Sequence, residues 1–420
     1  MADWHTIIRE RDFPMIEQAE CDGRPVIYLD NAATTQCARP VLWALENYWR
    51  SQHANVYRGV YCLSRRAEAA VEETRQICAE FLGAASAGEI VFTGGATQSA
   101  NLLADAFALT ELKPGDLVLS TEMEHHSNLL PWREACRRTG AELALVPVTE
   151  EGELDLDALD RLLERRPKLL AVCAVSNVLG TVNPLREIAD RAHAAGCAVA
   201  VDAAQAMRCC LPGVRELDCD FLYFSSHKVM GPTGVGVLYG SEAWLERLTP
   251  PRTGGGMVSA IREDTVLYER GPLKFEAGTP NLAGIAGLGA ALEYLQAVGR
   301  RRIAKREKAL LQYAEKRLRE LPGLRILGAP KQRAGVLSFV APPLQAYDIA
   351  MLLDSQGIAV RSGSHCAIPL HRRLGLSGSV RVSPAFYNTA EELDALTVAL
   401  RRSLEGAKKA GVPVGENARG

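Results

Sequence analysis

The chain has 420 residues, of which 47% are hydrophobic, and its 48 basic and 50 acidic side chains give a formal net charge of −2. This composition is that of an ordinary globular protein of two or three domains, which excludes wholesale disorder. The charge balance provides no overall attraction to nucleic acid or to an anionic membrane. No apolar run reaches the roughly 18 residues of a membrane span, and the polar start of the chain does not resemble a signal peptide. We therefore expect a cytoplasmic protein without nucleic-acid or membrane partners.

Strand and helix patterns alternate from about residue 65 to residue 240, after an N-terminal helix and an extended arm. This alternation is typical of an α/β fold in which helices cover both faces of a mostly parallel sheet, here of seven strands. Several of the strands are apolar throughout, as expected when both faces are buried. The expected strands are 89–93, 117–120, 142–146, 169–175, 197–202, 220–224 and 235–239, and the helices between them include 66–82, 128–139, 154–164 and 185–195.

A long helical pattern over 285–321, interrupted near Gly299, separates this region from a smaller α+β region. The basic run that follows Gly299 lies on an amphipathic helix with interleaved glutamates, which favours a solvated face over a nucleic-acid site. Short strands are expected at 335–340, 358–361 and 379–383, and helices at 346–356 and 390–404. We divide the chain into an arm at 1–24 that packs on the small domain, a large domain at 25–290, a small domain at 291–406 and a disordered tail at 407–420.

The eleven cysteines are scattered through the sequence and form no CxxC pair. Their odd number and their spacing argue against a disulfide framework and a zinc site, and the eight histidines form no ligand-spaced cluster, so no metal is expected. Most of the cysteines should be reduced and buried. Cys366 differs, because it lies in the polar segment Arg361-Ser-Gly-Ser-His-Cys. Its neighbours Arg361 and His365 favour the thiolate, which is the nucleophilic form of cysteine.

Two apolar strands near the middle of the chain end in chemically active side chains. Asp202 ends one strand and is followed by Gln205, and Lys228 follows the next strand beside Ser225 and His227. Ligands of open α/β sheets bind at this carboxyl edge. A lysine beside a hydroxyl and an imidazole can form a Schiff base. The pair matches the layout in which Asp holds the pyridinium nitrogen of pyridoxal 5'-phosphate and Lys holds its aldehyde carbon.

Two further segments fit the same cofactor. In Thr93-Gly-Gly-Ala-Thr97, glycines follow a strand and open a helix, so backbone N–H groups such as that of Ala96 and the Thr97 hydroxyl can face a phosphate. In Glu124-His-His-Ser-Asn128, which follows the next strand, His125 can stack on the ring and move protons.

With these motifs the sequence resembles the class V aminotransferase superfamily of fold type I pyridoxal-phosphate enzymes. Within that superfamily it is most similar to the SUF-type (group II) cysteine desulfurases and selenocysteine lyases, over about residues 5–405. The resemblance rests on motifs in a common order: Asn55-Val-Tyr-Arg-Gly, Glu124-His-His-Ser-Asn, Ser176-Asn-Val-Leu-Gly, Asp202-Ala-Ala-Gln, Ser225-Ser-His-Lys, Phe275-Glu-Ala-Gly-Thr-Pro-Asn and Arg361-Ser-Gly-Ser-His-Cys-Ala.

The resemblance implies an enzyme that converts L-cysteine to L-alanine and supplies sulfur for iron–sulfur cluster assembly. Lys228 corresponds to the lysine that forms the internal aldimine, and Cys366 to the thiol that receives the sulfur as a persulfide. The resemblance further implies that His125 transfers protons and that His125, Asp202 and Gln205 contact the cofactor ring. It implies that the phosphate is bound by Ala96, Thr97, Ser225 and His227, and by Thr279 across a homodimer interface. The residues implied to bind substrate are Asn177, Arg361 and Arg381.

Some positions depart from the usual group II pattern. Ser364 and Tyr57 stand where these proteins usually have histidine, and Ala96 stands where they usually have threonine. These departures bear on substrate preference, persulfide turnover and activation by a partner. Tyr347 replaces a histidine typical of members that use a zinc-binding scaffold, which favours a SufE-type sulfur acceptor.

Three other functions are considered. A selenocysteine lyase acting on L-selenocysteine uses the same residues, and the sequence does not separate it from a desulfurase. An aminotransferase or epimerase is disfavoured because it has no need of Cys366. A non-catalytic paralogue that only binds a sulfur carrier would be marked by loss of Lys228, Asp202 or Cys366, and all three are present.

Overall fold

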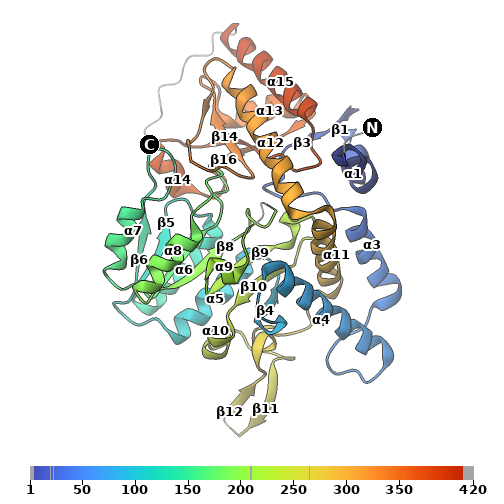
Figure 1. Cartoon of the computed structure of the whole chain (residues 1–420), viewed down its shortest axis with the longest axis vertical. Coiled ribbons are helices and arrows are strands. Elements are labelled where there is room, and N and C mark those ends of the chain that lie inside the picture. Colours follow the sequence, from blue (N-terminus) through green and yellow to red (C-terminus); the bar gives the residue numbers. More distant parts are fainter. Residues whose placement is uncertain (1–3, 19, 22, 209–210, 264, 410–420) are drawn as a thin grey trace.

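A seven-stranded sheet forms the centre of the large domain in a computed structural model that describes residues 4–18, 20–21, 23–208, 211–263 and 265–409 (Figure 1). The strand order β4-β10-β9-β8-β7-β5-β6 confirms the expected mostly parallel sheet, in which only β10 runs antiparallel to its neighbours. The strands are β4 (Ile90–Thr93), β5 (Leu117–Thr121), β6 (Glu142–Val146), β7 (Leu169–Cys173), β8 (Ala198–Asp202), β9 (Phe221–Ser225) and β10 (Gly236–Gly240).

Helices cover both faces of this sheet, as the apolar strands require. On one face, alternate residues such as Val118 and Tyr223 pack with Phe107 and Trp132 from α5 and α6. On the other face, residues such as Leu170 pack in a cluster that also holds side chains of α4, α8 and α11. The helices of the large domain are α3 (Arg39–Asn47), α4 (Cys62–Leu82), α5 (Ala96–Thr110), α6 (His126–Thr139), α7 (Leu156–Leu163), α8 (Leu185–Ala194), α9 (Val214–Leu217), α10 (Glu242–Arg247) and α11 (Leu282–Val298).

The interruption expected near Gly299 is a sharp bend. Helix α11 ends at Val298, α12 (Arg300–Arg319) begins directly afterwards, and their axes differ by 79°. Gly299 has a φ of +99°, which a residue with a side chain rarely adopts. Within the described residues no single helix has the length and apolarity to cross a membrane, although this bent pair passes the same test of length and composition.

The small domain is built on a four-stranded antiparallel sheet of order β13-β14-β17-β16. Its core joins that sheet to α12, α13 and α15 through side chains such as Leu310, Phe339, Leu353 and Leu396. Its elements are β13 (Arg325–Ile326), β14 (Leu337–Val340), α13 (Ala346–Asp354), β15 (Ile358–Ala359), β16 (Arg361–Gly363), α14 (Ile368–Arg373), β17 (Ser379–Val382) and α15 (Ala390–Lys409). Helix α15 therefore continues into the first three residues of the expected tail, and 410–420 lie outside the described residues.

The N-terminal segment contacts the C-terminal part of the chain. It contains α1 (Trp4–Asp12), α2 (Pro14–Gln18), β1 (Glu20–Cys21), β2 (Arg24–Pro25) and β3 (Ile27–Tyr28). The ring of Trp4 stacks on Phe386, Arg9 forms an ion pair of 2.9 Å with Glu392, and β3 pairs with β15. Residues 29–35 then cross from this region to the large domain, where the Thr35 N–H donates to the His227 carbonyl at 2.9 Å. The proposed domain limits remain predictions, and residue 290 falls inside α11.

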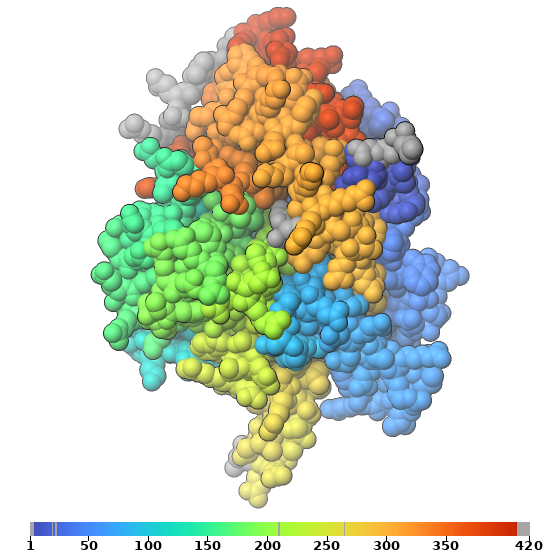
Figure 2. Space-filling view, in the orientation of Figure 1, coloured from blue at the N-terminus to red at the C-terminus, as the bar shows by residue number. Residues whose placement is uncertain are grey.

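A two-stranded hairpin projects from the body of the molecule (Figures 1 and 2). It consists of β11 (Val258–Arg262) and β12 (Thr265–Tyr268), which pair antiparallel. Ile261 at its tip is strongly exposed.

Candidate active site

Most of the predicted site residues come together at the carboxyl edge of the large sheet, whereas Thr279 lies at the surface. Asp202 is the last residue of β8, and Lys228 ends a short helical turn (Ser226–Lys228) directly after β9. In the small domain, β16 and β17 carry Arg361 and Arg381, and Cys366 follows β16. The electrostatic neighbours of Lys228 are Asp202, Arg381, Arg361 and Cys366, so both domains contribute to one site.

Lys228 is poised to react as a neutral amine. Its pKa is lowered to about 8, first by burial and then by the nearby arginines, whereas the carboxylate of Asp202 opposes this shift. The ordinary pKa of lysine is about 10.4. At neutral pH, roughly a tenth of the Lys228 side chains are therefore uncharged, whereas an exposed lysine would be almost wholly charged.

Asp202 is a buried carboxylate held by the backbone. Its Oδ1 accepts the Ala204 N–H at 2.8 Å. Burial raises its pKa, and Lys228 opposes that shift. Gln205, on the turn after β8, donates its amide to the Ala32 carbonyl at 2.8 Å and so connects this edge to the crossing segment 29–35.

His125 is fixed by the start of α6. Its Nδ1 accepts the Ser127 N–H at 3.1 Å, so the neutral ring carries its proton on Nε2. Burial and the neighbouring Lys228 lower the pKa of His125 to about 3, which keeps the ring neutral at physiological pH. The adjacent Glu124 anchors this loop: its buried carboxylate accepts from the Thr121 hydroxyl and from the Cys173 N–H in β7. Sequence reasoning assigned no role to Glu124.

The turn before α5 can hold an anion. Gly95 has a φ of +147°, and a Cβ on Gly236 would lie 2.5 Å from the Gly95 Cα, so two backbones touch here. The first N–H groups of the fifteen-residue helix α5 lack intrahelical partners, and its dipole favours negative charge. The Ala96 N–H donates to Ser225 Oγ at 2.8 Å, and Thr97 Oγ1 lies 2.7 Å from Ser127 Oγ.

His227 and Thr279 complete the predicted phosphate contacts. His227 lies between Ser226 and Lys228 and is partly exposed, and burial and Lys228 lower its pKa to about 4. Thr279 is exposed and its Oγ1 lies 3.4 Å from Asn55 Oδ1. This single chain gives Thr279 a place at the surface, as a contact across a dimer would need.

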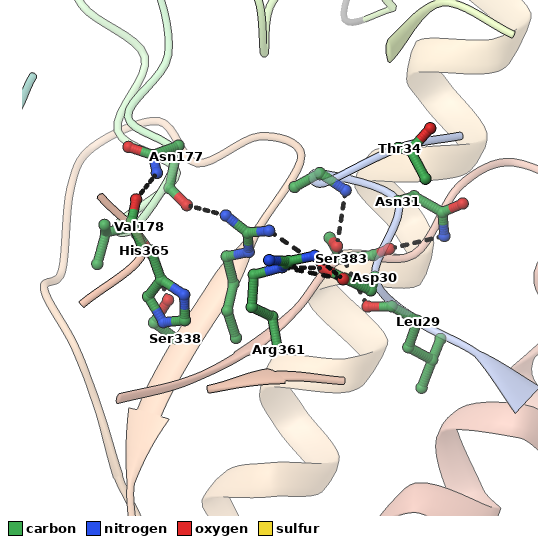
Figure 3. A network of polar contacts seen from close by, with 12 residues as sticks. Leu29, Asp30, Asn31, Thr34, Asn177, Val178, Ser338, Arg361, His365 and Ser383 are labelled. Atoms are coloured by element: carbon green, nitrogen blue, oxygen red, sulfur yellow. Dashed lines mark hydrogen bonds and ion pairs between the residues drawn. The ribbon is translucent and has the colours of Figure 1, made fainter. Parts of the chain in front are cut away.

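Both predicted substrate-binding arginines share the carboxylate of Asp30, which the sequence did not single out. Figure 3 shows Asp30 beside Arg361. Asp30 Oδ2 accepts from Arg361 Nε at 3.0 Å and lies 2.8 Å from its Nη2. Arg381 Nη2 donates to Asp30 Oδ1 at 3.1 Å, and its Nη1 donates to the Asn177 carbonyl at 3.1 Å. Arg381 is buried, and its Nε has no partner among the described residues. The two guanidinium groups carry two positive charges, and the Asp30 carboxylate balances one of them. One positive charge therefore remains to bind an anionic ligand.

Cys366 is exposed on a tight turn in which its neighbours His365 and Ala367 are buried. Its φ is +56°, its side chain is exposed, and its carbonyl accepts the His126 N–H at 2.7 Å. Asn177, expected to bind substrate, donates its side-chain amide to the His365 carbonyl at 2.8 Å (Figure 3). In this structure Asn177 therefore supports the cysteine turn.

A large cavity lies elsewhere in the molecule. It has a volume of about 1290 Å³ and lies between α8, α12 and the segment 329–335. None of the predicted site residues lines it. The site is therefore defined by its chemistry and not by the size of a cavity.

The donor set at the sheet edge fits a flat aromatic ring with a phosphate and an aldehyde. A half-buried amine with a lowered pKa suits the aldehyde, a buried carboxylate suits a pyridinium nitrogen, and a helix N-terminus suits the phosphate. These features define the class of pyridoxal-phosphate enzymes of fold type I.

Comparison with known proteins gives the family. Residues 27–396 match the family model described as aminotransferase class-V, and the chain belongs to this family of pyridoxal-phosphate enzymes. It is 43% identical over 93% of its length to a cysteine desulfurase of Pectobacterium atrosepticum, of which it covers 96%. A solved apo structure of a cysteine desulfurase from Thermococcus onnurineus superposes with a TM-score of 0.90 at 38% identity, covering 97% of this chain and 100% of that one.

Some relatives are longer than this chain. A cysteine desulfurase of Synechococcus elongatus is 43% identical over 94% of this chain, which spans only 63% of that protein. The homology therefore covers one part of that relative.

The lowered pKa of Lys228 predicts how cofactor uptake depends on pH. The uncharged amine is the form that adds to an aldehyde, so uptake by the apoprotein should rise about 15-fold between pH 6.5 and 8 and level off above about pH 9. The absorbance of the lysine-bound cofactor, followed after mixing at each pH, measures this rate. An uptake rate that still rises about sevenfold between pH 9 and pH 10 would show that Lys228 titrates like an exposed lysine.

Proposed function

We propose that this chain is a cysteine desulfurase that converts L-cysteine to L-alanine and keeps the sulfur as a persulfide on Cys366. The observation that carries the proposal is the position of Cys366, an exposed thiol on a turn bonded to the His125–His126 loop and electrostatically coupled to Lys228. A transaminase would need the lysine and the carboxylate but not this thiol. The names of the relatives support the same activity.

Each residue of the site has a chemical task in this reaction. The bound cofactor, when present, acts as an electron sink for the substrate carbons. Arg381, with Arg361 beside it, binds the substrate carboxylate through N–H groups left over by Asp30 and Asn177. Asp202 holds the cofactor ring nitrogen, and Gln205 and His125 contact the ring.

Sulfur transfer needs no external oxidant or reductant. The sulfur of Cys366 attacks the substrate sulfur, the substrate C–S bond breaks, and its electron pair stays with the carbon. Lys228 removes the α-proton and returns it to carbon, and the proton that the Cys366 thiol loses goes to the carbon that loses the sulfur. His125 can relay a proton between these groups, because its neutral ring gives the Nε2 proton as it takes another and so ends unchanged. L-cysteine and the Cys366 thiol thus give L-alanine and a persulfide, with atoms and electrons conserved.

Ala96, Thr97, Ser225 and His227 are the proposed phosphate contacts of one subunit, and Thr279 of a partner subunit completes the set. The exposed side chains Trp43, Trp49, Val60 and Tyr61 supply apolar surface for the homodimer that this requires. We further propose that a SufE-type protein accepts the sulfur for iron–sulfur cluster assembly. The thiol must stay reduced, which is consistent with a cytoplasmic location.

The proposal is tested on purified protein loaded with cofactor and given L-cysteine. Alanine should form, and the intact mass should increase by one sulfur atom, which maps to Cys366 and is lost with reductant. The same assay with L-selenocysteine separates the alternative: alanine from selenocysteine alone would identify a selenocysteine lyase. Cofactor-loaded protein that acts on neither substrate would refute the proposal.

Asp30→Asn is expected to raise the KM for L-cysteine about tenfold or more and to change kcat less than threefold. The amide keeps the shape of Asp30 but loses its charge, so Arg361 and Arg381 lose the carboxylate that orients them. Steady-state alanine formation over a range of cysteine concentrations measures both constants. Glu187→Gln, which breaks an exposed ion pair with Arg191, is the control. A lower KM in Asp30→Asn would show instead that Asp30 competes with the substrate.

A further inference from the structure

The turn that presents Cys366 adopts an unfavourable backbone conformation. His365 and Cys366 have φ values of +51° and +56°, and both carry side chains. In this left-handed region the Cβ crowds the following carbonyl, so two consecutive non-glycine residues stay there only when their surroundings hold them. The backbone N–H of His126, which donates to the Cys366 carbonyl, and the side-chain amide of Asn177, which donates to the His365 carbonyl, supply part of this hold.

A closed set of buried hydrogen bonds supplies another part. His365 Nε2 and His371 Nε2 each lie 3.1 Å from the hydroxyl of Ser379, and His371 Nδ1 lies 3.1 Å from the Ala367 carbonyl. Ser379, His365 and His371 are all buried. His365 and Ala367 flank Cys366, so the two histidines connect both neighbours of the thiol to one hydroxyl.

The chemistry of these atoms fixes the direction of every bond. The Ala367 carbonyl can only accept, so His371 carries its proton on Nδ1 and its neutral Nε2 must accept from Ser379. The single proton of Ser379 is then used, so its oxygen accepts from His365 Nε2–H. Burial lowers the pKa of both histidines, in agreement with neutral rings. His365 Nδ1 is left as a buried acceptor with no partner among the described residues.

Ser379 also lies on the strand that carries Arg381. It is the first residue of β17 and pairs in register with Gly363 of β16. A Cβ on the preceding Gly378 would lie 3.1 Å from the Gly363 carbonyl carbon, which shows how closely the two strands approach. The hydroxyl therefore has a fixed position relative to the substrate-binding arginine.

We propose that Ser379 is a positioning residue for the Cys366 nucleophile. Through His365 and His371 it holds the left-handed turn, and so sets where the sulfur atom lies relative to the substrate bound at Arg381. This inference rests on the proposed function. It assigns to Ser379 and His371 an effect on the sulfur-transfer step and not on substrate binding.

The test compares cofactor-loaded wild type, Ser379→Ala, Ser379→Thr and His371→Asn. Ser379→Ala should lower kcat for alanine formation at least tenfold and leave the KM for L-cysteine within twofold. Ser379→Thr keeps the hydroxyl and should recover most of kcat. His371→Asn keeps an N–H near the Ala367 carbonyl but loses the bond to Ser379, and should resemble Ser379→Ala. Thr397→Val, which removes another buried hydroxyl of the small domain, is the matched control.

A second measurement does not depend on the reaction. Hydrogen exchange in the peptide around Cys366 should be faster in Ser379→Ala and in His371→Asn, because the Ala367 N–H bond to the Ser364 carbonyl closes this turn. Thr397→Val should leave it unchanged. An unchanged kcat in Ser379→Ala, or equal losses in Ser379→Ala and Thr397→Val, would overturn the inference. If the wild type forms no alanine, the proposed function fails, and the exchange data still decide whether Ser379 holds the turn.

Discussion

Cys366→Ser is expected to keep the bound cofactor and to lower alanine formation from L-cysteine by about a thousandfold or more. Serine has nearly the shape of cysteine, so the turn at 364–367 and its bonds to His126 and Asn177 should persist. Its hydroxyl is a far weaker nucleophile than a thiol and cannot hold sulfur as a persulfide. Visible absorbance measures the cofactor, and alanine and sulfide are assayed in the same sample.

Cys62→Ser is the control for this variant, because Cys62 is also exposed but lies at the start of α4. It should retain both cofactor and activity. Alanine formation at the wild-type rate in Cys366→Ser would disprove the persulfide mechanism. Loss of the reaction with L-cysteine but not with L-selenocysteine would show that the thiol is needed for sulfur alone.

The large sheet could be predicted almost strand by strand because its signal is local. Strands β7, β8 and β9 are buried on both faces, so each one appears in the sequence as a continuous apolar run. The strands of the small domain were predicted less accurately. The segment 358–361, predicted as one strand, is two short ones: β15 pairs with β3 and β16 pairs with β17. Which partner a strand takes depends on distant residues that a local pattern does not contain.

The same distinction separates the site residues that the sequence predicts from those that only the structure brings to the site. Asp202, Lys228 and Cys366 stand in polar motifs at the ends of apolar strands or in a polar loop, so chemistry and position coincide in the sequence. Asp30 lies 331 residues from Arg361, in a turn of small residues with no chemical signal of its own. The pairing of β3 with β15 and the bridge between Asp30 and Ser383 bring it to the arginines.

Ser379 and His371 were missed for a similar reason. Each is an unremarkable polar residue in the sequence, and their meeting with His365 depends on the close approach of β16 and β17. Asn177 was placed in the right region, but its amide bonds the cysteine turn in this structure. Sequence motifs therefore predict the reactive groups, whereas the groups proposed to position them required the three-dimensional arrangement.

Lys228→Ala is expected to remove covalent cofactor binding and to lower alanine formation by about a thousandfold or more. The variant lacks the amine that lies near Asp202, and it also lacks the group proposed to take the α-proton. Reduction of the wild type with borohydride, followed by peptide mass spectrometry, should find the cofactor attached to Lys228.

Lys274→Ala is the matched control, since burial also lowers the pKa of Lys274 but its amine donates to the Leu245 and Glu246 carbonyls outside the site. It should keep the visible band, whereas Lys228→Arg, which preserves charge without a primary amine, should lose it. Attachment of the cofactor to any other lysine in the wild type would contradict the assignment. The peptide that carries the added mass identifies the lysine that binds the cofactor in the wild type. This measurement therefore distinguishes a wrong assignment of Lys228 from loss of the cofactor through instability of a variant.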